Sequence, residues 1–298
     1  MQPLHLRFLV GSCFVLLLAL SSATGQNLGA ILAREGWTVQ QVAPGVELRQ
    51  RHFTNLFDSA QFITLLAVDL SQTNSRIRFA AAQQFGTNQM VVPDLAEKAG
   101  AVAAMNGGFF GKEPTANSGI LKIDGKLLPF TRKESDELHF VGGSAVGIDQ
   151  GGQWHFIERP GASWPDDWKE VEHALAGGHP LVLKGKIHSE VIRTNYKHAR
   201  EARHVLSKHP RTAIGVTTNR IALLLSADGR HPENAEGLTM QQTAEVMQAL
   251  GCDNAINLDG GGSTTVWLKG QGIVNHPSDN KKFDKEGARL VRTAVIVE

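Results

Sequence analysis

The chain has 298 residues, 42% of them hydrophobic, and it carries 30 Lys or Arg side chains against 29 Asp or Glu. This length is enough to bury a full core in one large domain or two small ones. A net charge of +1 argues against the strongly basic surface that binds nucleic acid or an anionic membrane, so neither partner is expected.

The amino terminus is expected to be a secretory signal. A short stretch with basic residues at 1–7 precedes an uncharged apolar run at 8–20, and small residues then suit cleavage after Ala23 or Gly25. The apolar run is shorter than the about 20 residues that cross a bilayer. We therefore expect residues 1–25 to be removed, leaving a secreted or periplasmic protein without a stable membrane anchor.

The remaining chain divides into an amino-terminal extension at 26–59 and one domain at 60–298, and the first half of this domain is predicted to be mostly strands. Residues 62–70 form a buried strand by their β-branched and apolar content, and residues 91–100 form a short helix that ends at a glycine. A hairpin at 119–130 turns at Asp124-Gly125, and another strand pair follows at 144–157.

The second half contains the clearest helix. Residues 166–178 are predicted as a helix and residues 213–230 as two strands with a short connection. Residues 239–251 form a further helix, because Thr239 and Gln242 have capping-box spacing and apolar residues recur at helical intervals. Adjacent hairpins and few helices predict an α+β fold with a mixed, largely antiparallel central sheet flanked by helices.

Two helix-strand units share a layout. In each, a helix ends at a glycine, Gly100 or Gly251, a strand follows, and a polar residue comes six positions after that glycine, at Asn106 or Asn257. Chance and an old internal duplication both explain the likeness. In either case, each unit delivers a polar residue followed by glycines to a strand end, where sites are built in open α/β sheets.

The second of these loops reads "NLDGGGSTT". Glycines let backbone amides approach a ligand closely, and the candidates in the two loops are Gly107, Gly108, Gly260, Gly261 and Gly262. Asp259 supplies a charge, and Ser263 and Thr264 supply hydroxyl groups for phosphate or sugar oxygens. The alternative is a tight glycine turn at a sheet corner that Asp259 caps. The loop lacks the lysine of a Walker loop and the spacing of a dinucleotide-binding fingerprint.

Several segments together resemble the phosphodiester glycosidase family over roughly residues 60–298. They are "AAMNGGFF", "RTAIGVT", "SADGR", residues 237–267 and the ending from "NHPSD" to "RTAVIVE". The resemblance implies hydrolysis of the bond between an anomeric carbon and a phosphodiester, which leaves a free sugar and a phosphomonoester. It also implies a carbohydrate phosphodiester as partner, which is N-acetylglucosamine-linked in the reaction after which the family is named, whereas the expected signal segment fits a cell-envelope polysaccharide better.

Candidate roles follow from that reaction. Arg211 and Arg230 are phosphate ligands, or else a surface arginine and a solvated turn residue. Asn106 hydrogen-bonds the sugar or phosphate, or holds its turn. Asp259 and Asp228 follow strands and are the catalytic carboxylates, as base and nucleophile or stabiliser. Retaining, inverting and substrate-assisted mechanisms all stay open.

The histidines give weaker signals. His179 lies on a turn into a strand and either lines the site or has no role. The segment 193–211 is predicted to be exposed and basic, and the six- and five-residue spacings of His198, His204 and His209 do not place them on one helical face for a metal. No cofactor is expected, although a structural calcium ion held by Asp and Asn oxygens is an alternative.

Two further hypotheses come from other functional classes. One is a metal-dependent phosphodiesterase that cuts the P–O bond. The other is a non-catalytic envelope protein that binds phosphorylated polysaccharide through the same glycine loops.

Overall fold

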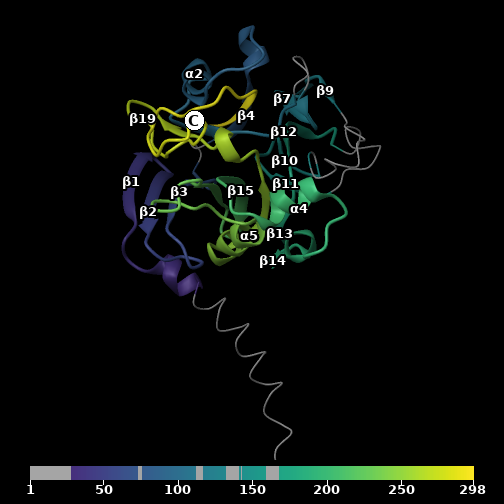
Figure 1. Ribbon diagram of the computed structural model, residues 1–298. Coiled ribbons are helices and arrows are strands. Elements are labelled where there is room, and N and C mark those ends of the chain that lie inside the picture. Colours follow the sequence, from purple (N-terminus) through teal and green to yellow (C-terminus); the bar gives the residue numbers. More distant parts are fainter. Residues whose placement is uncertain (1–27, 73–75, 112–116, 132–140, 142, 159–167) are drawn as a thin grey trace, which may run out of the picture. The chain divides into compact units, whose positions relative to one another are not determined.

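The computed structural model describes residues 28–72, 76–111, 117–131, 141, 143–158 and 168–298 (Figure 1). The chain divides into two units, Met1–Glu35 and Gly36–Glu298. The first contains a short helix at 28–33, and the second contains every strand described below. The expected signal segment lies outside the described residues. None of the described helices is long and apolar enough to span a membrane.

The largest sheet has eight antiparallel strands and includes residues expected in the amino-terminal extension. Its order is β1 (Thr38–Ala43), β2 (Val46–Phe53), β3 (Gln61–Asp69), β16 (Ile221–Ala227), β15 (Arg211–Thr217), β17 (Cys252–Asn257), β13 (Pro180–Leu183) and β14 (Lys186–Ile187). β2 pairs with β3 along its whole length. Residues 38–53, which were expected in the amino-terminal extension, therefore belong to the same sheet as β3, the first strand of the expected domain.

Two five-stranded sheets complete the main β-structure. One has the order β11 (Trp154–Glu158), β10 (Ser144–Asp149), β12 (Val171–Gly177), β7 (Leu121–Ile123) and β8 (Lys126–Leu127). The other has the order β19 (Gly272–Ile273), β18 (Val266–Leu268), β5 (Ala103–Asn106), β20 (Thr293–Val297) and β4 (Ile77–Ala81). Among the described strands, only the short pair β6 (Asn117–Ser118) and β9 (Phe130–Thr131) is parallel.

These three sheets enclose one hydrophobic core. Leu66 and Ile214 come from the eight-stranded sheet, Val146 and Leu175 from the second sheet, and Met105 from the third, and all five are at most 2% exposed. The expectation of a largely antiparallel fold is confirmed. The expectation of a single central sheet is wrong, because no one sheet is large enough to bury this apolar surface alone and the three bury it against each other.

Helices cover only parts of the sheets. α2 (Val92–Lys98) packs its apolar side on β5 and β20, and α5 (Met240–Ala249) packs on β13 and β17. The short helices α3 (Ser189–Ile192) and α4 (Ala199–Leu206) pack against α5. Single 3-10 turns occur at η1 (Ala82–Phe85) and η3 (Gly261–Ser263).

Most of the predicted elements are confirmed, with their local signals. Gly100 follows α2 with a φ of +74°, and Asp124 and Gly125 both have positive φ in the β7–β8 turn. The capping box of α5 is formed, because the Gln242 amide donates to the Thr239 hydroxyl and the Thr239 amide donates to Gln242 Oε1. These features depend on neighbouring residues only, which is why the sequence reveals them.

The helix predicted at 166–178 is wrong, since its described part forms strand β12. β12 pairs with β10 on one side and with β7 on the other. The end of β12 packs so closely on β17 that a Cβ at Gly177 would lie 2.4 Å from the Asn257 carbonyl oxygen, so this position requires glycine. Pairing on both edges outweighs the helix propensity of the alanine, leucine and glutamate residues.

Candidate active site

Three strands bring polar loops to the same end of the β-structure. The first residue of β15 pairs with the last residue of β16, and its third residue pairs with the last residue of β17. The loops after β16 and β17, which carry Asp228 and Asp259, therefore leave the sheet near each other. The loop after β5 joins them, because the Asp259 amide donates to the Gly107 carbonyl at 3.1 Å.

Asp228 holds His276 through a set of hydrogen bonds. His276 Nδ1 lies 2.8 Å from Asp228 Oδ2, and the His276 amide donates to the same oxygen at 2.9 Å. Asn275 Nδ2 donates to Asp228 Oδ1, also at 2.9 Å. Asp228 is only 1% exposed, and this burial raises the pKa of its carboxyl although the hydrogen bonds act in the opposite direction. Both oxygens are thus engaged in fixing the neighbouring loop, and Asp228 positions the His276 ring.

Two aromatic side chains also pack against the His276 imidazole ring. Phe283 stacks on it with ring centroids 3.9 Å apart and planes 14° apart, and Phe62 meets it edge-on at 4.8 Å. The side chain of His276 is still 18% exposed. Its Nε2 atom has no hydrogen-bond partner among the residues that the structure describes, so this nitrogen is available to water or to a ligand.

The three-glycine loop makes room for charged side chains. A Cβ at Gly262 would lie 2.4 Å from Asp279 Oδ1 and 2.6 Å from Arg289 Nη2. A Cβ at Gly261 would lie 2.9 Å from Arg230 Nη2. Asp279 and Arg289 form an ion pair, with 2.9 Å between Nε and Oδ1. The absence of Cβ atoms therefore lets two guanidinium groups and one carboxylate lie directly against the backbone.

Asp259 lies beside this charged group. Burial raises the pKa of its carboxyl from 3.8 to about 6, while the Ser263 hydroxyl and the Arg289 guanidinium act in the opposite direction. The residue keeps partial exposure to solvent. A carboxyl group that titrates near neutral pH beside a cation is typical of functional sites.

Asn106 holds the glycine loop from inside the protein. It is fully buried, and its Nδ2 donates to the Asp259 carbonyl at 2.6 Å. Its Oδ1 accepts hydrogen bonds from the Thr212 hydroxyl and the Thr265 amide, each at 3.1 Å. This geometry makes Asn106 a positioning residue for Asp259 and does not agree with direct contact to a substrate.

Several amides that were predicted to bind a ligand are used within the protein. The Gly107 amide donates to the Thr293 carbonyl at 2.8 Å, and the Gly108 amide donates to Thr293 Oγ1 at 3.0 Å. The Gly261 amide donates to the Pro210 carbonyl at 2.8 Å. A Cβ at Gly260 would lie 2.6 Å from that same carbonyl oxygen. Close packing between loops is thus the local reason for these glycines.

Ser263 and Thr264 are buried, at 0% and 1% exposure. Thr264 Oγ1 lies 3.2 Å from the Thr212 hydroxyl oxygen, and the Thr264 carbonyl accepts a hydrogen bond from Asn275 Nδ2 at 3.1 Å. Asn275 also donates to Asp228, so it connects the loop after β16 with the glycine loop. Thr264 therefore belongs to the internal framework of the site, whereas the buried Ser263 hydroxyl lies beside the Asp259 carboxyl.

Arg211 does not point toward the glycine loop as a phosphate ligand would. It is 1% exposed, and its Nε donates to the Leu238 carbonyl at 2.7 Å. Its Nη2 donates to the carbonyls of His204 and Ser207 at 2.7 and 2.9 Å. Burial lowers the pKa of this guanidinium to about 9. These main-chain contacts tie α4 to the start of β15, so the geometry does not agree with the phosphate role predicted for Arg211.

His179 lies in the same interior. It is 1% exposed, stacks on His204 with ring centroids 5.9 Å apart, and has Nδ1 3.5 Å from Glu190 Oε2. Burial lowers the pKa of both imidazole rings. The segment 193–211, predicted to be exposed and basic, contains α4, in which Arg200 and Arg203 are exposed whereas Glu201 is fully buried with its Oε1 2.7 Å from Arg193 Nη2.

One group of residues at the glycine loop is not fully buried, and we call it the polar cluster. Its members are Arg230, Asp259, His276, Asp279 and Arg289. Only two of them were predicted as site residues. His276 and Asp279 lie in the "NHPSD" segment of the resemblance, which was their available signal, whereas nothing in the local sequence marks Arg289. Within the described ranges, no three His, Cys, Asp or Glu side chains gather in a way that could hold a metal ion.

Known proteins are similar to this chain in sequence and in fold. Residues 99–298 match the family described as phosphodiester glycosidase. The N-acetylglucosamine-1-phosphodiester alpha-N-acetylglucosaminidase of Mus musculus is 30% identical over 203 residues, which cover 63% of this chain and 36% of the mouse protein. The chain thus spans about a third of the length of that relative.

Two solved structures share the fold. The catalytic domain of zebrafish N-acetylglucosamine-1-phosphodiester alpha-N-acetylglucosaminidase, auto-inhibited by its pro-peptide, has a TM-score of 0.65 at 20% identity, with 88% of each chain covered. A putative exported protein from Burkholderia pseudomallei K96243 has a TM-score of 0.56 at 17% identity, with 80% of this chain and 74% of that chain covered.

Proposed function

Because the chain belongs to the phosphodiester glycosidase family, we propose that it is a hydrolase that cleaves the glycosidic bond of a sugar-1-phosphodiester. The polar cluster is the observation that carries this proposal, since it combines two guanidinium groups with a carboxyl of raised pKa and a positioned imidazole. The name of the mouse relative supports an N-acetylglucosamine substrate, and a cell-envelope polysaccharide with the same linkage is the related alternative.

Arg230 and Arg289 are the proposed ligands of the phosphodiester. Both guanidinium groups lie against the glycine loop, and each supplies planar pairs of donors that suit phosphate oxygens. Arg289 also forms an ion pair with Asp279, which holds its guanidinium group in place beside the loop. A phosphomonoester is a good leaving group, so catalysis requires charge stabilisation on this side more than a strong general acid.

Asp259 and His276 act on the sugar side. The Asp259 carboxylate stabilises the positive charge that develops at the anomeric carbon, as carboxylates do in glycoside hydrolysis. His276 Nε2 accepts a proton from the attacking water, while Asp228 holds the opposite side of the ring at Nδ1. The water oxygen bonds to the anomeric carbon, and the bond from that carbon to the phosphate oxygen breaks. The bonding electrons leave with the phosphate.

The location of the protein is part of the proposal. The apolar segment after the basic amino terminus supports export, as does the fold shared with a putative exported protein. We propose cleavage after Ala23 or Gly25 and a secreted or periplasmic mature protein.

Release of sugar from defined substrates tests the activity. The panel contains α- and β-linked sugar-1-phosphodiesters, headed by a methyl phosphodiester of N-acetylglucosamine-1-phosphate, and products are separated by chromatography with mass detection. We expect free sugar and methyl phosphate from the wild type, and no turnover from Asp259→Asn. Asp253→Asn is the matched control, because this residue lies near the other end of the strand that leads to Asp259.

The product and the effect of a chelator distinguish the other hypotheses. Sugar phosphate as the product, with loss of activity in chelator, would instead indicate a metal-dependent phosphodiesterase. Binding of the panel without release of any product, retained in Asp259→Asn, would indicate a non-catalytic binding protein.

A further inference from the structure

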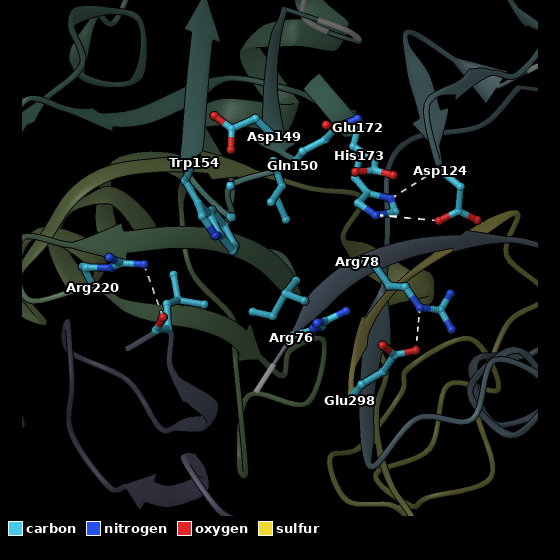
Figure 2. Close-up of a pocket in the computed structure, with 15 residues that line it drawn as sticks. Arg76, Arg78, Asp124, Asp149, Gln150, Trp154, Glu172, His173, Arg220 and Glu298 are labelled. Carbon is cyan, nitrogen blue, oxygen red and sulfur yellow. Dashed lines mark hydrogen bonds and ion pairs between the residues drawn. The ribbon is translucent and has the colours of Figure 1, made fainter. Parts of the chain in front are cut away.

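A cavity of about 560 Å³ lies away from the polar cluster and shares no lining residue with it (Figure 2). We call it the distal cavity. Arg220, which lines the cavity, directly precedes β16, whereas Asp228 follows the end of the same strand. Eight residue steps at about 3.3 Å each place the two sites about 26 Å apart along the strand.

The termini of other strands surround the same cavity. Arg76 precedes β4, Asp149 ends β10, and Glu298 follows β20. The opposite end of β20, by contrast, lies at a glycine loop, since the carbonyl of Thr293 at the start of β20 accepts a hydrogen bond from the Gly107 amide. The two sites thus lie at opposite ends of one set of strands.

One wall of the distal cavity offers an aromatic surface. Figure 2 shows Trp154 on one side and His173 with Asp124 on the other. The Trp154 indole packs against the core and stacks with Phe156, with ring centroids 6.1 Å apart and planes 29° apart. It is therefore held in place while part of it stays exposed. The electron-rich face of an indole attracts the C–H groups of a pyranose ring.

Planar polar side chains stand around this surface. Gln150 and Glu172 line the cavity, and neither side chain makes a hydrogen bond or ion pair with another described residue. Amide and carboxylate groups of this kind accept hydrogen bonds from sugar hydroxyls, and the amide also donates them. The combination of one aromatic face with a few convergent polar groups is typical of a site for a small polar ligand.

Two guanidinium groups in the cavity form no ion pair within the described part of the chain, although Arg220 is near enough to Asp69 to help lower the pKa of that carboxyl. Arg76 is exposed, and no hydrogen bond joins its side chain to a described residue. Arg220 donates only to the Leu70 carbonyl, at 3.3 Å. Arg78, in contrast, is paired with Glu298 at 2.6 Å. Arg76 and Arg220 are thus the groups that can bind a carboxylate or a phosphate.

We propose that the distal cavity is a second, non-catalytic site that binds an acidic saccharide. Trp154 lies under one sugar ring, Gln150 and Glu172 bind its hydroxyls, and Arg76 and Arg220 bind its carboxylate or phosphate group. For a polymeric substrate, such a site would keep the chain bound while the polar cluster cleaves it. This last use depends on the proposed function, whereas the binding itself does not.

Isothermal titration of the mature chain, residues 26–298, tests the proposal with three probes that contain N-acetylglucosamine. Hyaluronan hexasaccharide carries carboxylates, N-acetylglucosamine-6-phosphate carries a phosphate, and chitohexaose is neutral. We expect an acidic probe to bind more tightly than chitohexaose, with an affinity that falls as salt concentration rises. Which of the two acidic probes binds distinguishes a carboxylate from a phosphate ligand.

Variants assign the binding to the cavity. Trp154→Ala should weaken it at least about tenfold, as loss of a central aromatic contact commonly does. Arg76→Ala should weaken the acidic probe about fivefold and leave chitohexaose unchanged. Lys269→Ala is the control, because it removes an exposed positive charge elsewhere. Circular dichroism checks that Trp154→Ala is folded, and Arg76, being exposed, provides a test that does not disturb the core.

Asp259→Asn separates this proposal from the proposed function, because it should lose turnover and bind these probes like the wild type. No binding of either acidic probe would overturn the proposal, as would binding that is unchanged in both Trp154→Ala and Arg76→Ala.

Discussion

Replacing Asp259 by asparagine should stabilise the protein at neutral pH while it removes activity. Burial raises the pKa of this carboxyl from 3.8 to about 6 in the folded state. A folded-state pKa above the unfolded value means that ionisation opposes folding, so stability is lost as pH rises from the lower value through the higher one. The shift is about two units at about 1.36 kcal/mol each, which gives a cost of about 3 kcal/mol above pH 7.

The asparagine variant avoids this cost and keeps nearly the same shape. Urea unfolding should show Asp259→Asn to be more stable by about 3 kcal/mol at pH 7.5, and by less than about 1 kcal/mol at pH 4, where the wild-type carboxyl is protonated in the folded state and only partly ionised in the unfolded state. Asp253→Asn serves again as the control and should change little. An Asp259→Asn variant that is no more stable than the wild type at pH 7.5, or a gain that does not depend on pH, would refute the reasoning.

The other predictions concern the remaining parts of the site. If Asp259 acts as a carboxylate, kcat/KM should rise with pH through about 6. Arg289→Gln should move this rise to higher pH, because Arg289 lowers the pKa of Asp259. A kcat/KM that does not depend on pH would contradict that role. Asp228→Asn should lower kcat about 10²-fold to 10³-fold and change KM less than about threefold, since it acts through the orientation of His276; steady-state kinetics would reject this if KM alone changed. Arg211→Met should destabilise the fold by about 3 kcal/mol, because the Arg211 hydrogen bonds to three carbonyls are lost; urea unfolding measures it, and an unchanged midpoint would place Arg211 outside the framework.

The sequence predicts most elements of this fold because their signals are local. The capping box of α5, the glycine after α2 and the Asp124-Gly125 turn each depend on a few adjacent residues. β12 is the exception, because its two pairing partners lie at 121–123 and 144–149, well before it in the chain. The division into three sheets is likewise not visible in the sequence, since it depends on which strands pair and not on where they begin.

The candidate site shows the same limit. The sequence places the glycine loop and both carboxylates after strands, and the structure brings these strand ends together. Their roles could not be separated, since Asp228 and Asp259 differ only in what surrounds them. Asp228 has both oxygens bonded and is 1% exposed, whereas Asp259 keeps access to solvent. Arg211 is likewise buried with its guanidinium bonded to main-chain carbonyls, whereas Arg230 is exposed beside the glycine loop.

The "NLDGGGSTT" loop has an internal purpose that its composition conceals. Asn106 holds the carbonyl of Asp259, and Asn275 joins the carbonyl of Thr264 to Asp228. Asn106 bridges 153 residues of the chain, and Asn275 bridges 47 residues to reach Asp228. A rigid framework of this kind is what keeps a buried carboxyl in an unfavourable environment, where its pKa stays near 6. The glycines and hydroxyl residues of this loop thus maintain the geometry of the site. The proposed chemistry is carried out by the few side chains of the polar cluster.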